Sequence, residues 1–302
     1  MSIKNDLARL TIKAGLRLSF KLPSLLPLPV AVLRSGMEQS AQLFKVREDV
    51  QVESVTIGGI RAERLSPQQK TDKVILHLHG GAFFTGSAKT HRALGAEFAA
   101  RAQAVVYMLE YRLAPEYPYP AALDDGLAAY RALLALGYDP HNIVLGGDSA
   151  GCAHILSLSV LLRDQGLALP AGLFMISPYV DMTLSAASIT TLKTRDPMLT
   201  AYALRRGSLG YHRSIKTHDP RVSPLFADLR GLPSLLIQVG SEEILLDDAL
   251  RLTELARAAG VDVDCQIFDG MWHNFQMFNA FFPVADQATN QIALFVKQHT
   301  GG

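Results

Sequence analysis

A serine set between small residues is the first feature of this 302-residue chain that could do chemistry. Ser149 lies in GDSAG, residues 147–151, at the end of the apolar run NIVLGG and at the start of a helical pattern. A strand, a tight turn and a helix in this order push a serine hydroxyl out beside the helix N-terminus, where backbone N–H groups favour an anion. The pattern predicts that Ser149 is a nucleophile, although an ordinary strand-to-helix turn has a similar sequence.

A reactive serine needs a general base and a carboxylate that orients this base. Where a strand, turn and helix carry the serine, the chain order is serine, acid, histidine. His273 lies in FDGMWHNF, just past the last clear strand, and is the predicted base. The acid is expected after the strand SLLIQVG, where Glu243 lies nearer the strand end than Asp247. We predict that Glu243 is the acid and keep Asp247 as the alternative.

A second glycine-rich turn, HGGA at residues 79–82, follows the apolar run KVILHLH. Small residues let backbone N–H groups face a developing oxyanion, and each such donor contributes roughly 3 kcal/mol of transition-state stabilisation. The predicted oxyanion hole consists of the N–H groups of Gly80, Gly81, Ala82 and Ala150.

Short apolar runs alternate with helical patterns and must position these residues. The runs at 73–79, 104–111, 142–147, 172–177, 234–240 and 263–268 have the composition of strands buried on both faces. Helical patterns at 91–103, 121–137, 150–166 and 247–260 fall between them, and a hairpin is expected around Gly58 and Gly59. The alternation predicts an α/β fold with a mostly parallel central sheet and helices on both faces. The run at 263–268 could be a sheet edge, which favours a homodimer.

Two segments depart from this alternation and are expected to cap the site. Residues 1–45 are predicted to form an N-terminal helical cap segment, and residues 46–302 the catalytic domain. Within this domain, the stretch from about 182 to 223 is far longer than an ordinary connection, which indicates a lid insertion.

The N-terminal segment is apolar and basic without resembling a signal peptide or a membrane span. Lysine and arginine recur through it, so no uninterrupted apolar run forms. Apolar residues fall at helical spacing instead, at Ile3, Leu7, Leu10, Ala14 and Leu18. We expect this face to pack on the body of the protein rather than on a membrane, and the absence of a cleavable signal favours the cytoplasm.

Composition narrows the choice of partners and cofactors. The chain is 49% hydrophobic and 19% charged, as in a globular protein, and its 29 basic and 28 acidic residues nearly cancel. Bulk charge therefore gives no reason to expect nucleic acid as a partner. Cys152 and Cys265 are too few and too far apart for a disulfide framework or a zinc site, and we expect both to be buried thiols. No ligand cluster or phosphate loop indicates a metal or a cofactor.

Together the motifs resemble the hormone-sensitive lipase family, the bacterial esterase and acetyl-hydrolase branch of the α/β-hydrolases. The resemblance rests on HGGA, YRLAPE, GDSAG, SPYVDMT, DPMLT, SPLFADLRGLP and WHNF, and covers about residues 65 to 278. It implies an α/β-hydrolase fold with Ser149 as nucleophile and His273 as base, and it makes His79 structural. Glu243 stands where the family more often has aspartate. Within YRLAPE, we expect Arg112 and Glu116 to brace a loop near the site.

These features predict a serine carboxylester hydrolase that works through an acyl-enzyme intermediate on a small-molecule ester. The apolar residues of the cap suggest short- to medium-chain or hydrophobic esters: Leu7, Leu10, Phe20, Leu184, Met198 and Leu204. A lactonase or an amidase with the same triad remains an alternative. A non-catalytic binding protein on the same scaffold is a third reading, which the presence of His273 disfavours.

Overall fold

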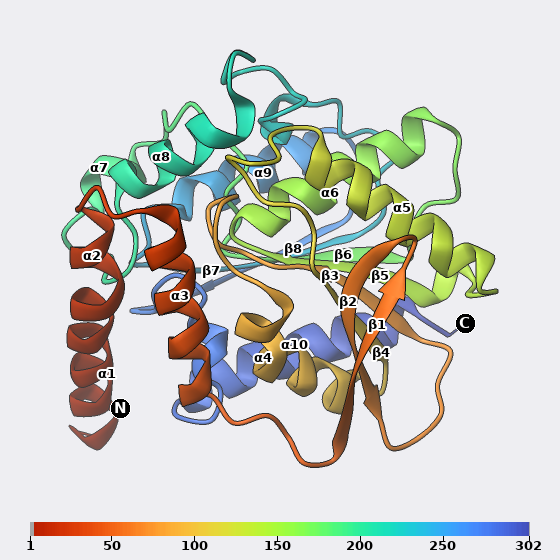
Figure 1. The fold of residues 1–302 in the computed structure, drawn as a ribbon, viewed down its shortest axis with the longest axis horizontal. Helices are drawn as coiled ribbons and strands as arrows, with labels where there is room; N and C mark the ends of the chain where they lie inside the picture. Colours follow the sequence, from red (N-terminus) through yellow and green to blue (C-terminus); the bar gives the residue numbers. More distant parts are fainter. Residues whose placement is uncertain (1–2, 302) are drawn as a thin grey trace.

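One eight-stranded sheet forms the centre of the computed structural model, which describes residues 3–301, with side chains from residue 9 onward (Figure 1). Its strands lie in the order β1-β2-β4-β3-β5-β6-β7-β8. Their bounds are β1 (Val50–Ile57), β2 (Ile60–Pro67), β3 (Val74–Leu78), β4 (Val105–Leu109), β5 (Ile143–Asp148), β6 (Gly172–Ile176), β7 (Leu235–Gly240) and β8 (Val263–Phe268). The hairpin β1-β2 is antiparallel and pairs antiparallel with β4, while β4, β3, β5, β6, β7 and β8 run parallel. The predicted α/β fold is confirmed.

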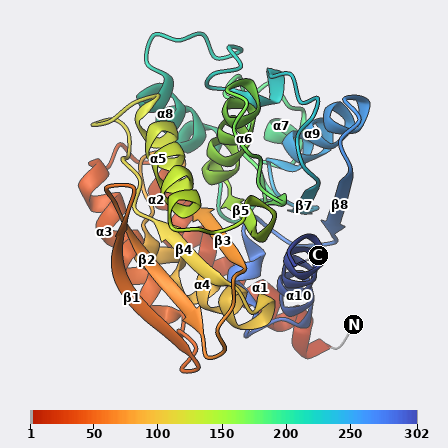
Figure 2. The same ribbon diagram turned by 90° about the vertical axis from the view of Figure 1, so that its right-hand side faces the viewer.

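Helices cover both faces of this sheet (Figure 2). One face is covered by α4 (Ala88–Ala102) and α10 (Pro283–His299), and the other by α5 (Ala121–Ala135), α6 (Ala150–Asp164) and α9 (Leu246–Ala258). Every residue of β3, β5, β6 and β7 is buried, which explains why these strands have near-continuous apolar sequences. The helix α10 was not among the predicted helices. β8 is an edge strand, as expected, and the homodimer stays a prediction.

The expected packing face of the N-terminal helix was wrong. This segment forms α1 (Ile3–Leu16), the π-helical turn η1 (Arg17–Lys21), α2 (Leu22–Ser24) and α3 (Val30–Ser40). Leu10 and Leu18 are 64% and 67% exposed, Ala14 is also exposed, and the side chains of Ile3 and Leu7 lie outside the described residues. The helix instead packs through the opposite face, where Leu16 is buried among aromatic residues of the loop after β8.

The N-terminal helices and the insertion after β6 contact each other. The insertion contains α7 (Ser188–Thr191) and α8 (Ala201–His212). The Arg17 guanidinium donates to the carbonyl oxygen of Thr194, the hydroxyls of Ser24 and Thr200 lie 3.0 Å apart, and Arg206 donates to the carbonyl oxygen of Leu28. The two predicted capping segments therefore form one layer beside the sheet, and the domain boundary itself stays a prediction. Among residues 3–301, no helix has the length and apolar character needed to cross a membrane.

Helix α8 touches the turn at residues 79–82 through a glycine. A Cβ added at Gly207 would overlap the carbonyl oxygen of Ala82, so only glycine permits this approach. A Cβ added at Gly210, one helical turn further along, would come no nearer than 3.5 Å to any heavy atom outside its immediate neighbours. The contact at Gly207 thus sets how closely the lid lies on the glycine-rich turn.

We expect Gly207→Ala to lower both the melting temperature and kcat, because the new methyl group pushes α8 away from Ala82. Gly210→Ala is the matched control. It should be neutral or stabilising by up to about 1 kcal/mol, since alanine favours a helix over glycine. Thermal unfolding and steady-state kinetics of both variants measure the difference. Equal behaviour of the two variants would show that the lid does not depend on this contact.

Candidate active site

Ser149 occupies a strained turn between β5 and α6. Its backbone has φ 51° and ψ −120°, a conformation that residues other than glycine rarely adopt. Two hydrogen bonds with the end of β6 and the loop after it hold this turn. Ser149 N–H donates to the Ile176 carbonyl oxygen at 2.8 Å, and Tyr179 N–H donates to the Ser149 carbonyl oxygen at 3.1 Å. A Cβ added at Gly151 would overlap the carbonyl oxygen of Leu78, so this glycine lets α6 pass close to β3. These features form the predicted nucleophile turn.

The structure brings Glu243 to His273. The Glu243 carboxylate is fully buried, and one of its oxygens lies 2.9 Å from His273 Nδ1. The other oxygen accepts hydrogen bonds from the Ser177 hydroxyl at 2.9 Å and from Gly240 N–H at 2.6 Å. With both oxygens occupied, the carboxylate is fixed in orientation and fixes the imidazole in turn. The alternative, Asp247, lies at the start of α9 and accepts a hydrogen bond from the Ser188 backbone at 2.8 Å.

A buried hydrogen bond joins the loop of His273, the predicted base, to the turn of Ser149, the predicted nucleophile. The Asn274 side-chain amide donates to Asp148 Oδ2 at 2.6 Å. Asn274 directly follows His273, and Asp148 directly precedes Ser149. The Asn274 backbone N–H also donates to the Ser177 hydroxyl at 3.1 Å, the same hydroxyl that donates to Glu243. The predicted acid, the loop of the predicted base and the turn of the predicted nucleophile therefore belong to one connected network.

Asp148 is the centre of this network, and sequence reasoning gave it no role. Besides Asn274, it accepts hydrogen bonds from Gly80 N–H at 2.9 Å, and it lies 3.1 Å from His77 Nε2 and 3.2 Å from His91 Nε2. Burial alone would raise the pKa of Asp148, but the charge of His91 and the hydrogen bonds from both histidines hold it well below its usual range. The same pairing raises the pKa of His91 against the effect of burial. Asp148 and His91 thus form a buried ion pair.

The role expected for Gly80 in the oxyanion hole is corrected by this network, because its N–H already donates to the Asp148 carboxylate. In the described part of the chain, the N–H groups of Gly81, Ala82 and Ala150 have no hydrogen-bond acceptor. Gly81 and Ala82 have φ values of 126° and 50°, so the turn changes direction sharply beside the Ser149 side chain. Three of the four predicted donors are left for an oxyanion.

His79 holds the same turn from within, in agreement with the structural role expected for it. Its Nδ1 lies 2.8 Å from the Gly80 carbonyl oxygen, and its ring stacks on Tyr111 with centroids 4.4 Å apart. Burial lowers the pKa of His79 to about 3, so the ring is neutral and donates from Nδ1. The Tyr111 hydroxyl donates to the His79 carbonyl oxygen at 2.6 Å.

The YRLAPE loop is braced on both sides, as predicted. Arg112 pairs with the buried Asp125 of α5, with Nη2 and Oδ1 2.7 Å apart, and Glu116 accepts two hydrogen bonds from Arg34 of α3 at 2.8 and 2.9 Å. The Arg34 Nε also donates to the Phe84 carbonyl oxygen at 2.8 Å, just past the glycine-rich turn. Sequence reasoning missed Arg34, whose partners lie far away along the chain.

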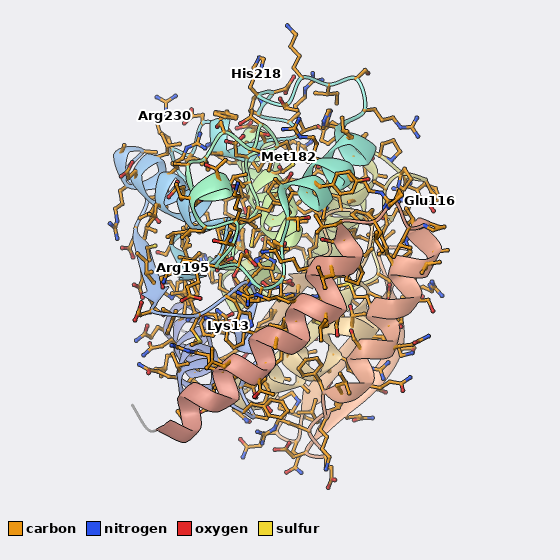
Figure 3. All side chains as sticks on the ribbon, turned by 90° about the vertical axis from the view of Figure 1, so that its left-hand side faces the viewer. Lys13, Glu116, Met182, Arg195, His218 and Arg230 are labelled. Carbon is orange, nitrogen blue, oxygen red and sulfur yellow. The ribbon has the colours of Figure 1, made fainter. Side chains whose placement is uncertain are left out.

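The first helix reaches the loop that carries Glu243, the predicted acid. Lys13, which is labelled in Figure 3, forms a salt bridge with Glu242, the neighbour of Glu243. Its Nζ lies 5.8 Å from the centre of the ring of Trp272, the neighbour of His273. Arg195 of the lid pairs with the same Glu242 at 3.2 Å. The buried Asp196 carboxylate accepts a hydrogen bond from Ile244 N–H at 2.9 Å, on the other side of Glu243.

The two cysteines differ in their surroundings. Cys152 is buried as expected, whereas Cys265 is only half-buried, because it lies on the edge strand β8, which has one free side. Among residues 3–301, no group of three or more histidine, cysteine, aspartate or glutamate side chains is arranged to hold a metal ion.

Comparisons with known proteins agree with this geometry. A family model described as alpha/beta hydrolase fold matches residues 75–277. The chain is 45% identical over 281 residues to an esterase of Acinetobacter venetianus, covering 93% of each protein. It is 40% identical over 247 residues to an acetyl-hydrolase of Streptomyces hygroscopicus, covering 82% of this chain and 83% of the relative. The crystal structure of an esterase from the bacterial hormone-sensitive lipase family superposes with a TM-score of 0.93 at 38% identity, covering 100% and 99% of the two chains.

The ion pair between Asp148 and His91 predicts how stability depends on pH. Because the folded pKa of His91 is raised above 6.5, its contribution is fully present below this pH and is lost as the pH rises through the folded pKa. His91→Gln should be about 3–5 kcal/mol less stable than the wild type near pH 6, because the buried carboxylate loses its charged partner. The difference should narrow as the pH rises above 6.5 and through the folded pKa of His91.

Urea unfolding of the wild type and of His91→Gln across this pH range measures the effect. His141→Gln, which changes an exposed histidine, is the control and should follow the wild type at every pH. A difference between His91→Gln and the wild type that stays constant with pH would contradict the ion pair.

Proposed function

The chain belongs to the alpha/beta hydrolase fold family, in its hormone-sensitive lipase branch, and is a carboxylester hydrolase; we propose that it cleaves short- to medium-chain or hydrophobic esters through an acyl-enzyme intermediate on Ser149. The observation that carries this proposal is the buried network from Glu243 through His273 and Asn274 to Asp148, which ends beside the strained Ser149. Such strain is costly and persists where the surrounding structure holds it for a task.

In the proposed mechanism, the Ser149 oxygen attacks the ester carbonyl carbon while His273 Nε2 takes the hydroxyl proton. Glu243 accepts the hydrogen bond from His273 Nδ1, which fixes the tautomer and stabilises the imidazolium. The carbonyl oxygen becomes an oxyanion that the N–H groups of Gly81, Ala82 and Ala150 stabilise. When the intermediate collapses, the C–O bond to the alcohol breaks and His273 returns the proton to the leaving oxygen. Water then attacks the acyl-enzyme in the same way.

The proposed preference for short acyl groups rests on aromatic packing next to the oxyanion turn. Phe83, directly after Ala82, stacks on Tyr211 of α8 with ring centroids 4.3 Å apart and lies 5.5 Å from the Tyr179 ring. All three rings are buried, and in this proposal they limit the length of the acyl chain that fits beside the oxyanion turn. The name of the acetyl-hydrolase relative points the same way.

The cap residues expected to form an apolar lid support the preference only in part. Leu204 is buried, Phe20, Leu184 and Met198 are half-buried, Leu10 is exposed, and the Leu7 side chain lies outside the described residues. The relatives' names favour an ester over a lactone or an amide as the substrate. We further propose a cytoplasmic location, on the sequence pattern of the N-terminal segment.

We expect Ser149→Ala to lower kcat by about a millionfold and Glu243→Gln by about ten-thousandfold, since the first removes the nucleophile and the second leaves the imidazole without its orienting charge. Asp247→Asn is the matched control and should keep most of the activity, because Asp247 accepts its hydrogen bond from the lid backbone and not from His273. An organophosphate should label the wild type at Ser149, as located by mass spectrometry. Wild-type activity in Glu243→Gln, or labelling elsewhere, would contradict the assignment.

With soluble p-nitrophenyl esters below their micelle concentration, kcat/KM should be highest for short acyl groups. We expect the dodecanoyl ester to react about tenfold more slowly or worse than the butanoyl ester, a factor that 1.4 kcal/mol of poorer transition-state binding produces. Phe83→Ala should narrow this gap by opening the packed space. A steady rise in kcat/KM with chain length in the wild type would contradict the preference.

A further inference from the structure

An apolar stripe remains uncovered along the N-terminal helical segment. Leu18, Leu22 and Leu25 are 67%, 52% and 52% exposed and follow one another at intervals of four and three residues, so they share one helix face. Leu10 extends the stripe by two turns towards the N-terminus. Single exposed leucines are ordinary on protein surfaces, but a continuous row on one face indicates an interaction site.

The stripe is not a packing face that the chain covers itself. The segment is already anchored through its other side, where Leu16 is buried and Ile12 and Phe20 pack against the cluster around Trp272. Three further apolar side chains of the cap and the lid are about half exposed: Leu26, Val32 and Tyr202. Figure 3 looks onto this side of the molecule, where α1 and α3 run across the front.

The N-terminal segment that carries the stripe is rich in basic residues. Residues 1–45 carry seven lysines and arginines and only two acidic residues, whereas the remainder of the chain carries 22 basic and 26 acidic residues. Arg17 is exposed beside Leu18, and its guanidinium donates to the backbone of the lid at Thr194. Lys21 donates to the carbonyl oxygen of Lys193, which brings this further exposed lysine of the lid next to the segment.

We propose that this face binds the surface of an anionic phospholipid bilayer, with the helical segment lying in the plane of the headgroups. Helices that enter the boundary between headgroups and acyl chains typically expose leucines flanked by lysine and arginine, as this segment does. Basic side chains near the surface add an attraction to anionic lipid that salt screens. A second copy of this chain is a poorer occupant, because two such faces would bring their positive charges together.

Docking of this kind would place the capping layer, and with it the proposed site, against the lipid. The salt bridge from Lys13 to Glu242 ties the docked helix to the loop that carries Glu243. Esters that partition into the headgroup region would then be presented at the cap rather than from bulk water. The binding itself does not depend on catalysis and is measurable without it.

The test is co-sedimentation of the intact protein with vesicles of phosphatidylcholine containing phosphatidylglycerol, and with vesicles of phosphatidylcholine alone. The variant replaces Leu18, Leu22 and Leu25 by serine. The matched control replaces three exposed leucines elsewhere by serine: Leu136, Leu255 and Leu294. Hydrolysis of soluble p-nitrophenyl acetate and the melting temperature show that each variant is folded.

We expect the wild type and the control to bind the anionic vesicles at least tenfold more tightly than the stripe variant, with binding weakened by salt. Lys193→Gln should weaken binding to the anionic vesicles and leave hydrolysis of the soluble ester unchanged. Equal vesicle binding by the wild type and the stripe variant would overturn the proposal. The proposal would also be overturned if sedimentation velocity showed that the wild type is a dimer and that the stripe variant is a monomer, and if the wild type did not bind vesicles. The face would then join two copies of the chain.

Discussion

A single buried carboxylate, that of Asp148, determines where the other parts of the site can lie. A charge without access to water must be compensated by hydrogen bonds and by an opposite charge. Asp148 obtains these from Gly80 after β3, from His91 on α4 and from Asn274 in the loop after β8. Because three distant segments converge on it, the glycine-rich turn and the loop of the base are both held beside the nucleophile turn. The proposed catalytic geometry is thus a consequence of satisfying one buried charge.

The buried charge of Asp148 also explains why the neighbouring histidines His79 and His91 differ in charge. The rings of His79 and His91 stack with centroids 5.4 Å apart, so one positive charge disfavours a second. Against the effect of burial, the charge of Asp148, the hydrogen bond to Asp148 and the hydrogen bond to the Ser87 carbonyl oxygen raise the pKa of His91. Burial and the charge of His91 lower the pKa of His79 to about 3. The neutral His79 then donates to the Gly80 carbonyl oxygen. One histidine compensates the carboxylate, and the other shapes the turn.

The sequence predicted what local patterns determine, and missed what depends on contacts between distant residues. Apolar runs located the strands, and chain order identified Glu243 and His273, which the structure brings together. The Gly80 N–H was wrongly assigned to the oxyanion hole. Two consecutive glycines indicate that their N–H groups can face a site, but they do not show that the Asp148 carboxylate already accepts one of them. The role of Asp148 was missed for the same reason, since its partners are spread from residue 77 to residue 274.

The packing face of α1 was wrongly predicted, because a polar contact determines which of its two apolar faces is buried. Leu10, Ala14 and Leu18 recur every four residues, and so do Ile12, Leu16 and Phe20, so helical spacing alone cannot say which row is buried. The second row lies next to Lys13, and Lys13 reaches Glu242 and Trp272 only when that row packs inward. Pairing a nearly buried lysine with a carboxylate therefore orients the helix and leaves the first row in solvent. The same ion pair couples the cap to the loop of Glu243, so the surface that α1 presents outward and the position of the acid are fixed by one contact.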